Sequence, residues 1–303
     1  MALAGVDQQH LADADLPGMH AVVEEQPPIR DDQRDRNCVA VLGHPLAGLE
    51  AQADDAHRPA VGDLFEAEGT RLLADVRSRH VNIIHATGIE GARHARGTSV
   101  VIDVLRSFTV SAYALAGGVR ECRLVRTVAE ARALAERTPR SVICAEEEAL
   151  PVAGIPISNS PTAIRSTDLR DRVLIQRSSA GTQVAAEVAG DGDVFAASLV
   201  VARATVRACL SRAPQDITLI ASADHPEDHA CARYMEALIE GAQPDVDVLL
   251  EPLRASERYR RAMSGTWPGF PKTDLDLSLR PDLFDFAMPV SKEDGYLRLD
   301  ARF

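Results

Sequence analysis

The chain has 303 residues, a hydrophobic content of 46% and a formal net charge of -12 at pH 7. This length suffices for one large domain or two ordinary ones, and the acidic balance argues against nucleic-acid binding, which needs a basic face. No apolar run approaches the roughly 20 residues of a membrane span, and no charged-then-apolar signal peptide opens the sequence. We therefore expect a cytoplasmic protein that binds neither nucleic acid nor membrane, with a homodimer as the default assembly.

The first 80 residues differ in composition from the rest of the chain. They contain one aromatic residue, Phe65, and no lysine, and their hydrophobic periodicity is poor. Such a composition is typical of a segment that buries too little apolar surface to fold. We expect a poorly ordered extension over residues 1–80 without a catalytic role, or a natural start of the protein near Val81, followed by an α/β domain over 81–303.

From residue 81 onward, β-rich segments alternate with segments of helical periodicity. Thr127 and Glu130 have the spacing of a capping box, and Gly117 and Gly118 are a typical helix stop. The alternation predicts a three-layer α/β/α fold with a largely parallel or mixed sheet. Strands are expected at 81–85, 99–104, 121–125, 141–145, 172–177, 193–197, 216–222 and 285–290, the last at an edge, and helices at 107–116, 127–137, 181–188, 199–211 and 226–239.

Polar residues cluster where four of these expected strands end. Because the carboxyl ends of parallel strands open on one edge of a sheet, these clusters are expected to meet in a ligand-binding crevice. Carboxylates suit a hard cation such as Mg²⁺, and backbone N–H groups at helix starts suit a phosphate. The clusters are Asp103, Arg106 and Ser107; Glu146, Glu147 and Glu148; Ser178, Ser179, Gly181 and Thr182; and Asp224, His225, Glu227 and Asp228, together with the loop Ser158, Asn159 and Ser160 before Pro161.

Several of these residues also fit other roles. Asp103 is compatible with a helix cap, and Glu227 with the favourable first turn of a helix. His225 and His229 have a zinc-compatible spacing but lack the HExxH frame. Leu105 stands where aspartyl-phosphate phosphatases carry the second Asp of a D-x-D motif, so that mechanism lacks its general acid. No phosphate-loop, dinucleotide-binding or serine-hydrolase motif is present.

Four segments in order along the chain resemble the Mg²⁺-dependent 2-phosphosulfolactate phosphatases, the ComB family. They are VVIDVLRSFTVSAYALAGGV at 100–119, SNSP at 158–161, SSAGT at 178–182 and EDHACA at 227–232. The resemblance covers about residues 81–303 and implies a layered α/β fold. It also implies hydrolysis of a small phosphomonoester, 2-phosphosulfolactate, to sulfolactate and phosphate, a step associated with coenzyme M biosynthesis.

The chain departs from the family pattern at three positions. Glu147 stands where the family has Arg in Glu-Arg-Gly-Gly, Pro156 where it has Asp in Gly-Phe-Asp, and Ala180 where it has Asn in Asn-Gly-Thr. The lost cation and carboxylate leave two alternatives open. One is an anion-binding homologue without turnover, and the other is a phosphatase retuned to another small organic phosphate.

The residues and the resemblance together assign roles for a small anionic phosphorylated substrate and one Mg²⁺. The catalytic candidates are Asp103, Arg106 and Glu146. The Mg²⁺ ligands are expected to be Asp103, Glu227 and Asp228, and the substrate- and phosphate-binding residues Ser107, Asn159, Ser160, Ser179, Gly181 and Thr182.

Overall fold

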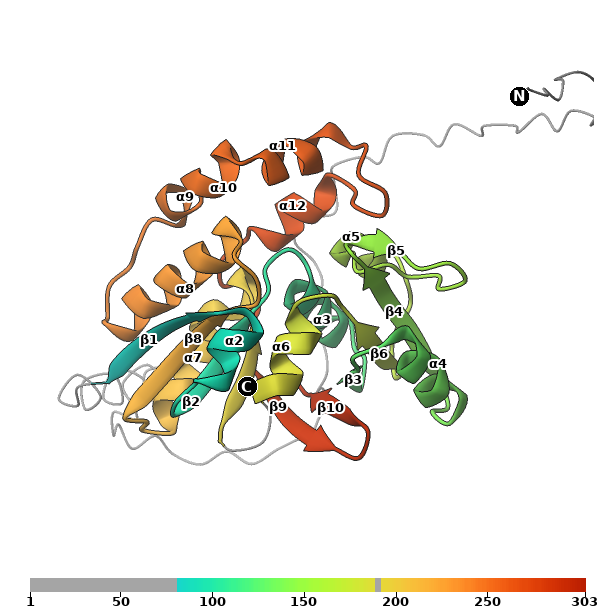
Figure 1. Ribbon diagram of the computed structural model, residues 1–303, viewed down its shortest axis with the longest axis horizontal. Helices are drawn as coiled ribbons and strands as arrows, with labels where there is room; N and C mark the ends of the chain where they lie inside the picture. Colours follow the sequence, from blue (N-terminus) through green and yellow to red (C-terminus); the bar gives the residue numbers. More distant parts are fainter. Residues whose placement is uncertain (1–80, 189–191) are drawn as a thin grey trace, which may run out of the picture. The chain divides into compact units, whose positions relative to one another are not determined.

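The computed structural model describes residues 81–188 and 192–303 (Figure 1). The predicted N-terminal extension over residues 1–80 lies outside the described residues. Every helix in the described part of the chain falls short of the length and apolarity needed to span a membrane.

A mixed sheet of ten strands organises the described residues, in the order β1-β8-β2-β7-β9-β10-β3-β6-β4-β5. Four strands form one parallel half, three form a second, and an antiparallel hairpin of β9 and β10 joins the halves. The first half consists of β1 (Asn82–Thr87), β8 (Asp216–Ala221), β2 (Thr98–Ile102) and β7 (Val194–Ala197). The hairpin consists of β9 (Met288–Glu293) and β10 (Tyr296–Leu299). The second half consists of β3 (Glu121–Leu124), β6 (Val173–Arg177) and β4 (Ser141–Glu147), and the short β5 (Leu150–Pro151) pairs antiparallel with β4.

Helices cover both faces of each half, as the predicted three-layer α/β/α fold requires. The inner helices, which Figure 1 shows between the two halves, are α2 (Gly88–Arg93), α3 (Ser107–Ala116) and α6 (Gly181–Val188). The first half carries α7 (Ala202–Ser211), preceded by a 3₁₀ turn over Leu199–Val201, and α8 (Pro226–Ile239) on its outer face, and the second half carries α4 (Val128–Glu136). The remaining helices are α5 (Pro161–Arg165), α9 (Val246–Leu249), α10 (Glu251–Ala255), α11 (Glu257–Ser264) and α12 (Thr273–Ser278).

The alternation of side chains along buried strands builds the core on both sides of the sheet. Val101 of β2 packs into an inner apolar cluster with Phe108 of α3 and Leu174 of β6. Its neighbour Ile102 packs into an outer cluster with Met235 of α8. Since successive strand residues point to opposite faces, a strand that is apolar throughout is stable only when helices cover both of its faces.

The strands of the two parallel halves run in opposite directions along the sheet. Three antiparallel pairs separate the two parallel halves, so a flat sheet would place their carboxyl ends at opposite edges. Instead, a hydrogen bond of 2.9 Å joins Asp103, which follows β2, to the backbone N–H of Gly181, which follows β6. The sheet therefore twists strongly across the β9–β10 hairpin, which lies below α3 and α6 in Figure 1, and brings both sets of strand ends together.

Most sequence expectations for individual elements are confirmed. The helices over 107–116, 181–188 and 226–239 have the predicted bounds. The capping box is present, because Thr127 Oγ1 accepts from the Glu130 N–H at 3.1 Å and Glu130 Oε2 accepts from the Thr127 N–H at 3.0 Å. The edge strand predicted at 285–290 is wrong. That segment contributes to β9, an internal strand that pairs with β7 at two positions and mainly with β10, a strand that the sequence pattern did not reveal.

Candidate active site

A cavity of about 200 Å³ opens where the carboxyl ends of strands from both halves meet. Five of the residues to which the sequence analysis assigned a role line it: Asp103, Arg106, Glu146, Asn159 and Ser179. The structure therefore brings together residues from the ends of β2, β4 and β6 and from the loop before α5, as the sequence analysis predicted for the strand ends.

Asp103 is buried, and both of its carboxylate oxygens accept hydrogen bonds from backbone groups. Oδ1 accepts from the N–H of Ser107 and Oδ2 from the N–H of Gly181, each at 2.9 Å, so one carboxylate ties together the starts of α3 and α6. Burial, and secondarily the charge of Glu146, raise the pKa of Asp103 to about 6, although the two N–H donors lower it. A carboxyl group with this pKa changes its protonation state close to neutral pH.

Glu146 is buried near the end of β4 and is held by the turn that follows β6. Its Oε1 accepts from the backbone N–H of Ser179, and its Oε2 accepts from the Ser179 hydroxyl at 3.1 Å and from the Ala149 N–H at 2.6 Å. Arg177 donates to the Ser179 hydroxyl at 3.1 Å and to the Glu146 carbonyl oxygen. The Glu146 carboxylate is therefore fixed at the cavity wall.

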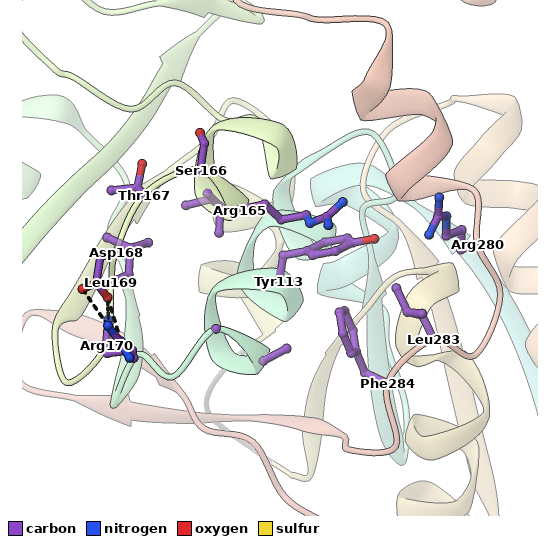
Figure 2. A pocket seen from close by; sticks show the side chains of 13 residues that line it. Tyr113, Arg165, Ser166, Thr167, Asp168, Leu169, Arg170, Arg280, Leu283 and Phe284 are labelled. Atoms are coloured by element: carbon purple, nitrogen blue, oxygen red, sulfur yellow. Dashed lines mark hydrogen bonds and ion pairs between the residues drawn. The ribbon is translucent and has the colours of Figure 1, made fainter. Parts of the chain in front are cut away.

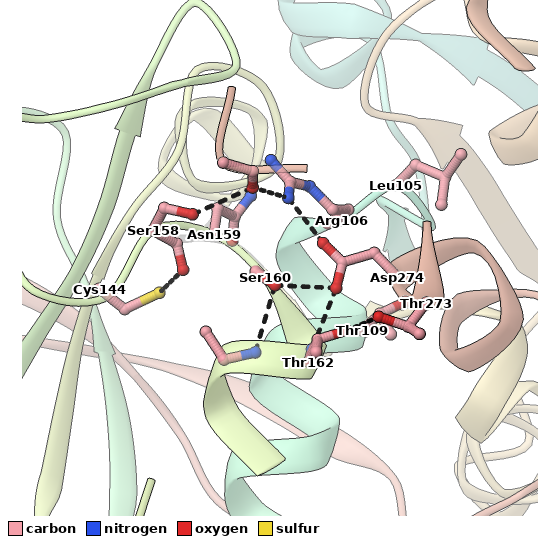
Figure 3. Close-up of polar contacts among 12 residues, drawn as sticks. Leu105, Arg106, Thr109, Cys144, Ser158, Asn159, Ser160, Thr162, Thr273 and Asp274 are labelled. Carbon is pink, nitrogen blue, oxygen red and sulfur yellow. Dashed lines mark hydrogen bonds and ion pairs between the residues drawn. The ribbon is translucent and has the colours of Figure 1, made fainter. Parts of the chain in front are cut away.

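Arg106 supplies a buried cation to the same cavity (Figure 3). Its Nη1 donates to Asp274 Oδ2 at 2.7 Å and to the carbonyl oxygen of Gly269, and the guanidinium stacks over the Phe270 ring at 4.1 Å from the centroid. Burial lowers the pKa of Arg106, while Asp274 raises it. Within the described residues neither Nε nor Nη2 of Arg106 donates a hydrogen bond, so these donors are available to an anion in the cavity.

Asp274, at the start of α12, is a residue that sequence reasoning missed. Besides holding Arg106, it accepts from the Ser160 hydroxyl at 2.8 Å and from the Thr162 N–H at 3.0 Å through Oδ1. The Ser160 hydroxyl also accepts from the Ala163 N–H at 3.2 Å as the N-cap of α5. Ser160 thus links α5 to α12, and it is not among the residues that line the cavity.

A buried amide connects two further predicted residues. Nε2 of Gln176 donates to the backbone oxygen and the hydroxyl of Ser107, at 2.7 and 3.2 Å, and to Asn159 Oδ1 at 3.3 Å. The Ser111 hydroxyl in turn donates to Gln176 Oε1 at 2.6 Å. Asn159 lines the cavity with its side chain held by this network, whereas Ser107 contributes mainly its backbone N–H to Asp103. Sequence reasoning did not single out Gln176, which lies within a strand.

Thr182 is buried and is not among the residues that line the cavity. Its hydroxyl donates to the backbone oxygen of Ser178 at 2.8 Å and accepts from the Ser178 N–H at 3.0 Å. Gly181 contributes its backbone N–H to Asp103 and has no room for a side chain, because a Cβ there would lie 2.6 Å from Asp103 Oδ2. These two residues shape the turn at the start of α6.

Asp228 lies behind the cavity wall at the start of α8. Its Oδ1 accepts from the Val104 N–H at 2.8 Å, and its Oδ2 accepts from the Ser222 hydroxyl at 3.0 Å. Burial, followed by the charges of Asp103 and Glu227, raises the pKa of Asp228 well above its ordinary value. The contacts tie the end of β2 to the end of β8.

Glu227 is buried and forms an ion pair with the half-buried Arg258 that sequence reasoning did not predict. Its Oε1 accepts from Arg258 Nε at 2.7 Å, and Arg258 Nη2 donates to the Leu105 carbonyl oxygen at 2.9 Å. Oε2 of Glu227 is buried without a hydrogen-bond partner in the described part of the chain. Arg258 itself lines the cavity, so α11 closes the side of the site next to Leu105.

The zinc spacing of His225 and His229 does not place both rings in the cavity. His225 lines it, and burial, followed by the charge of Arg258, lowers the pKa of His225. The His229 ring instead contacts Asp224 Oδ1 at 2.8 Å.

Comparison with known proteins shows the family of this chain. Residues 84–263 match the family described as 2-phosphosulpholactate phosphatase. The chain belongs to this family. A protein of Bacillus subtilis (strain 168) named "Probable 2-phosphosulfolactate phosphatase" is 31% identical over 201 residues, which cover 65% of this chain and 88% of that protein.

Relatives with the same printed name occur in other organisms. The protein of Thermoplasma acidophilum is 28% identical over 188 residues, covering 61% of this chain and 81% of its own length. The protein of Thermotoga petrophila is 31% identical over 173 residues, covering 56% of this chain and 72% of its own length. These likenesses confirm the family predicted from the sequence motifs and identify the chain as a phosphatase.

Two of the three departures from the family pattern lie outside the cavity of this phosphatase. Glu147 and Pro156 are exposed and are not among the lining residues. Ala180, in contrast, lines the cavity beside Ser179. The structure therefore limits the change in the pocket to one position of the three.

The carboxylates of this phosphatase fit a Mg²⁺ ion held by one or two of them. Among the described residues, no three His, Cys, Asp or Glu side chains form a group that could hold a metal, so Asp103, Glu227 and Asp228 are not a preassembled ligand set. Mg²⁺ commonly takes one or two carboxylates and completes its shell with water and phosphate oxygens. Asp103 and Glu146 both line the cavity and repel each other, and a cation between them relieves that repulsion.

Proposed function

We propose that this protein hydrolyses 2-phosphosulfolactate to sulfolactate and inorganic phosphate in a Mg²⁺-dependent reaction. The observation that carries the proposal is the presence of opposite charges in one cavity of about 200 Å³, which Asp103, Glu146 and Arg106 all line. The volume suits a small substrate, and the relatives' printed names supply the substrate.

Arg106 is the residue that we assign to the anionic groups of the substrate. Its Nη1 is fixed by Asp274, which leaves Nε and Nη2 to form a bidentate contact with phosphate or sulfonate oxygens. The Asn159 side chain, held by Gln176, adds a polar group beside it. These groups are assigned to orient the phosphate ester through charge and hydrogen bonds.

Asp103 and Glu146 are the residues that we assign to the metal. When bound, Mg²⁺ supplies charge neutralisation at the phosphate and lowers the pKa of a water ligand. Asp103 has to be ionised for this role, and its pKa of about 6 makes that form available at neutral pH. Glu227 and Asp228, the other predicted ligands, are engaged by Arg258 and by Val104 and Ser222, so we assign them to supporting the site.

A second candidate function is hydrolysis of a different small organic phosphate. Ala180 at the cavity wall favours it, because the family pattern has an Asn at this position and the pocket therefore lacks one amide group. The alternative without turnover rested on Glu147 and Pro156, which do not line the cavity. A place in coenzyme M biosynthesis and a cytoplasmic location stay predictions.

A substrate panel tests the proposal. The purified full chain is incubated with 2-phosphosulfolactate, phospholactate, phosphoglycerate and phosphoenolpyruvate, with Mg²⁺ or with a chelator, and released phosphate is measured. We expect the highest kcat/KM for 2-phosphosulfolactate, and only with Mg²⁺. A higher value for another ester would favour the second candidate, and no release from any ester by folded protein would refute phosphatase activity.

A further inference from the structure

A second cavity, of about 650 Å³, lies between the C-terminal ends of α3 and α5 and the segment after α12 (Figure 2). It shares no lining residue with the phosphatase cavity. Arg165, Arg170, Arg280 and Tyr113 are among the residues that line it. A cavity with this concentration of arginine is unexpected in a chain with a net charge of -12.

Two of the arginines face the cavity without a carboxylate partner. Within the described residues neither Arg165 nor Arg280 forms an ion pair, and Arg280 Nε donates only to the backbone oxygen of Asp276, at 3.0 Å. Arg170 differs, because it is paired with Asp168 at 3.0 Å. Figure 2 shows the Arg165 and Arg280 guanidinium groups on either side of the hydroxyl end of Tyr113.

The surroundings of Tyr113 support this placement of charge. Burial raises the pKa of Tyr113, and the positive charges of Arg280 and then Arg165 lower it, so both cations lie close enough to act on the phenol. The Tyr113 hydroxyl donates to the Leu277 carbonyl oxygen at 3.1 Å, so its proton is already engaged within the protein. Like charges that flank one cavity repel each other, and an anion between them replaces that repulsion by attraction.

An apolar wall completes the cavity. The ring of Phe284 packs edge-to-face on Tyr113 with centroids 5.0 Å apart, and Leu283 beside it is 42% exposed. Pockets for small molecules combine such a wall with a few polar groups that fix orientation, in a volume of roughly 300–1,000 Å³. The chemistry of the lining is therefore that of a site for an anion with an apolar body.

We infer that this cavity binds a small organic anion, with its phosphonate, phosphate or carboxylate head between Arg165 and Arg280 and its apolar body on Phe284 and Leu283. The site is separate from the catalytic one and does not depend on the proposed substrate.

The two helices that end at or next to these arginines also reach the catalytic cavity. Arg165 is the last residue of α5, and Arg280 follows the end of α12. At their other ends the same two helices meet through Asp274, which bonds Ser160 and Thr162 and holds Arg106. An anion that bridges the two arginines fixes α5 relative to α12 and so favours the arrangement that positions Arg106.

Calorimetric titration of the full chain with phenylphosphonate tests the inference. The probe has a dianionic head and an aromatic body and cannot be hydrolysed as a phosphate ester. The titration is carried out with 5 mM EDTA, wild type being compared with Arg165→Gln, Arg280→Gln, Arg106→Gln and Arg170→Gln. Separate titrations with inorganic phosphate and with benzyl alcohol measure the binding of an anionic head without an aromatic body and of an aromatic body without an anionic head.

The expected result is one binding event in wild type that persists in Arg106→Gln and Arg170→Gln. It weakens roughly tenfold or more in Arg165→Gln and in Arg280→Gln, the loss typical of one charged hydrogen bond. Both variants change exposed side chains, and their melting temperatures are expected to match that of wild type. Absence of binding to wild type would overturn the inference, as would loss in Arg106→Gln with no change in the other two, whereas failure of phosphatase activity would leave this readout intact.

Discussion

The carboxylate of Asp274 and the guanidinium of Arg106 form a buried ion pair, with Oδ2 and Nη1 2.7 Å apart and the side chains 0% and 3% exposed. The pair joins the motif after β2 to a helix near the C-terminus, outside the region 84–263 that the family match covers. Because two buried charges both lose hydration, such a pair contributes little net stability, and its effect is to fix the orientation of the cation.

Replacement of Asp274 by Asn is predicted to lower both stability and activity. It leaves Arg106 as a buried charge without a counter-ion, for which a loss of about 3–5 kcal/mol in the free energy of unfolding is expected. Without Asp274 the Arg106 guanidinium is no longer held in the orientation that contacts the substrate. We therefore expect KM to rise by a larger factor than kcat falls. Urea denaturation and steady-state kinetics measure the two effects.

Asp276→Asn is the matched control for Asp274→Asn. Asp276 lies on the same helix but is exposed, and its side chain forms no ion pair in the described part of the chain. We expect wild-type stability and kinetics. Equal behaviour of the two variants would contradict the role assigned to the buried carboxylate.

The buried carboxyl groups of Asp103, in the cavity, and Asp228, behind it, are predicted to make stability depend on pH. The pKa of Asp103 in the folded protein is about 6, above its ordinary value of 3.8, and that of Asp228 is raised in the same direction. Folding therefore favours the protonated forms. The resulting stabilisation is complete below pH 4 and is lost as the pH rises through about 6, a change on the order of 2–3 kcal/mol from Asp103.

Thermal unfolding in the presence of a chelator measures this dependence. Between pH 4 and pH 7 the contribution of Asp103 is expected to decline in wild type and to be absent in Asp103→Asn. Addition of Mg²⁺ at pH 7 is expected to restore stability to wild type only. A decline of equal size in both proteins would assign the pH dependence to other groups.

Gly181→Ala is predicted to disturb the cavity from the side of α6. The added Cβ would lie 2.6 Å from Asp103 Oδ2 and 3.1 Å from the Cβ of Ser107, so the carboxylate has to move and the N–H contact to it lengthens. We expect a loss of about 1–3 kcal/mol in unfolding free energy and a large drop in kcat. Gly117→Ala, where the nearest atom is a backbone oxygen at 3.2 Å, serves as a control with a much smaller effect.

The Mg²⁺ dependence of activity distinguishes two roles for Glu227 and Asp228, metal ligation and structural support of the site. Glu227→Gln weakens the ion pair with Arg258 and is expected to lower the melting temperature. If Glu227 and Asp228 only support the site, Glu227→Gln and Asp228→Asn keep a wild-type concentration of Mg²⁺ for half-maximal activity. An increase of tenfold or more in that concentration would instead make them metal ligands, as the sequence analysis predicted.

The sequence predicted those features that local chemistry determines. The helix over 107–116 ends at adjacent glycines, Pro161 begins α5, and the capping box of Thr127 and Glu130 is visible in four consecutive residues. Asp103, Arg106 and Glu146 were recognisable because polar residues at strand ends meet at one edge of an α/β sheet. Each of these signals lies within a few residues of the feature that it predicts.

The features that were not predicted depend on contacts between residues far apart in the sequence. Asp274 stands in a segment that looks like an ordinary acidic helix start, and only the fold places it against Arg106, 168 residues away. The same holds for Arg258 beside Glu227 and for β9 in the middle of the sheet. A short strand carries no information about its neighbours, so its position follows only from the complete topology.

The decisive measurement of Mg²⁺-dependent hydrolysis at Asp103 is steady-state release of phosphate from 2-phosphosulfolactate at pH 7.5. It compares wild type, Asp103→Asn and Asp276→Asn in the presence of Mg²⁺. We expect saturable release by wild type and Asp276→Asn that stops with a chelator. For Asp103→Asn we expect a decrease of roughly 1,000-fold in kcat/KM, the size of effect seen when a main electrostatic group is removed from an active site. Full activity of a folded Asp103→Asn protein would contradict this expectation.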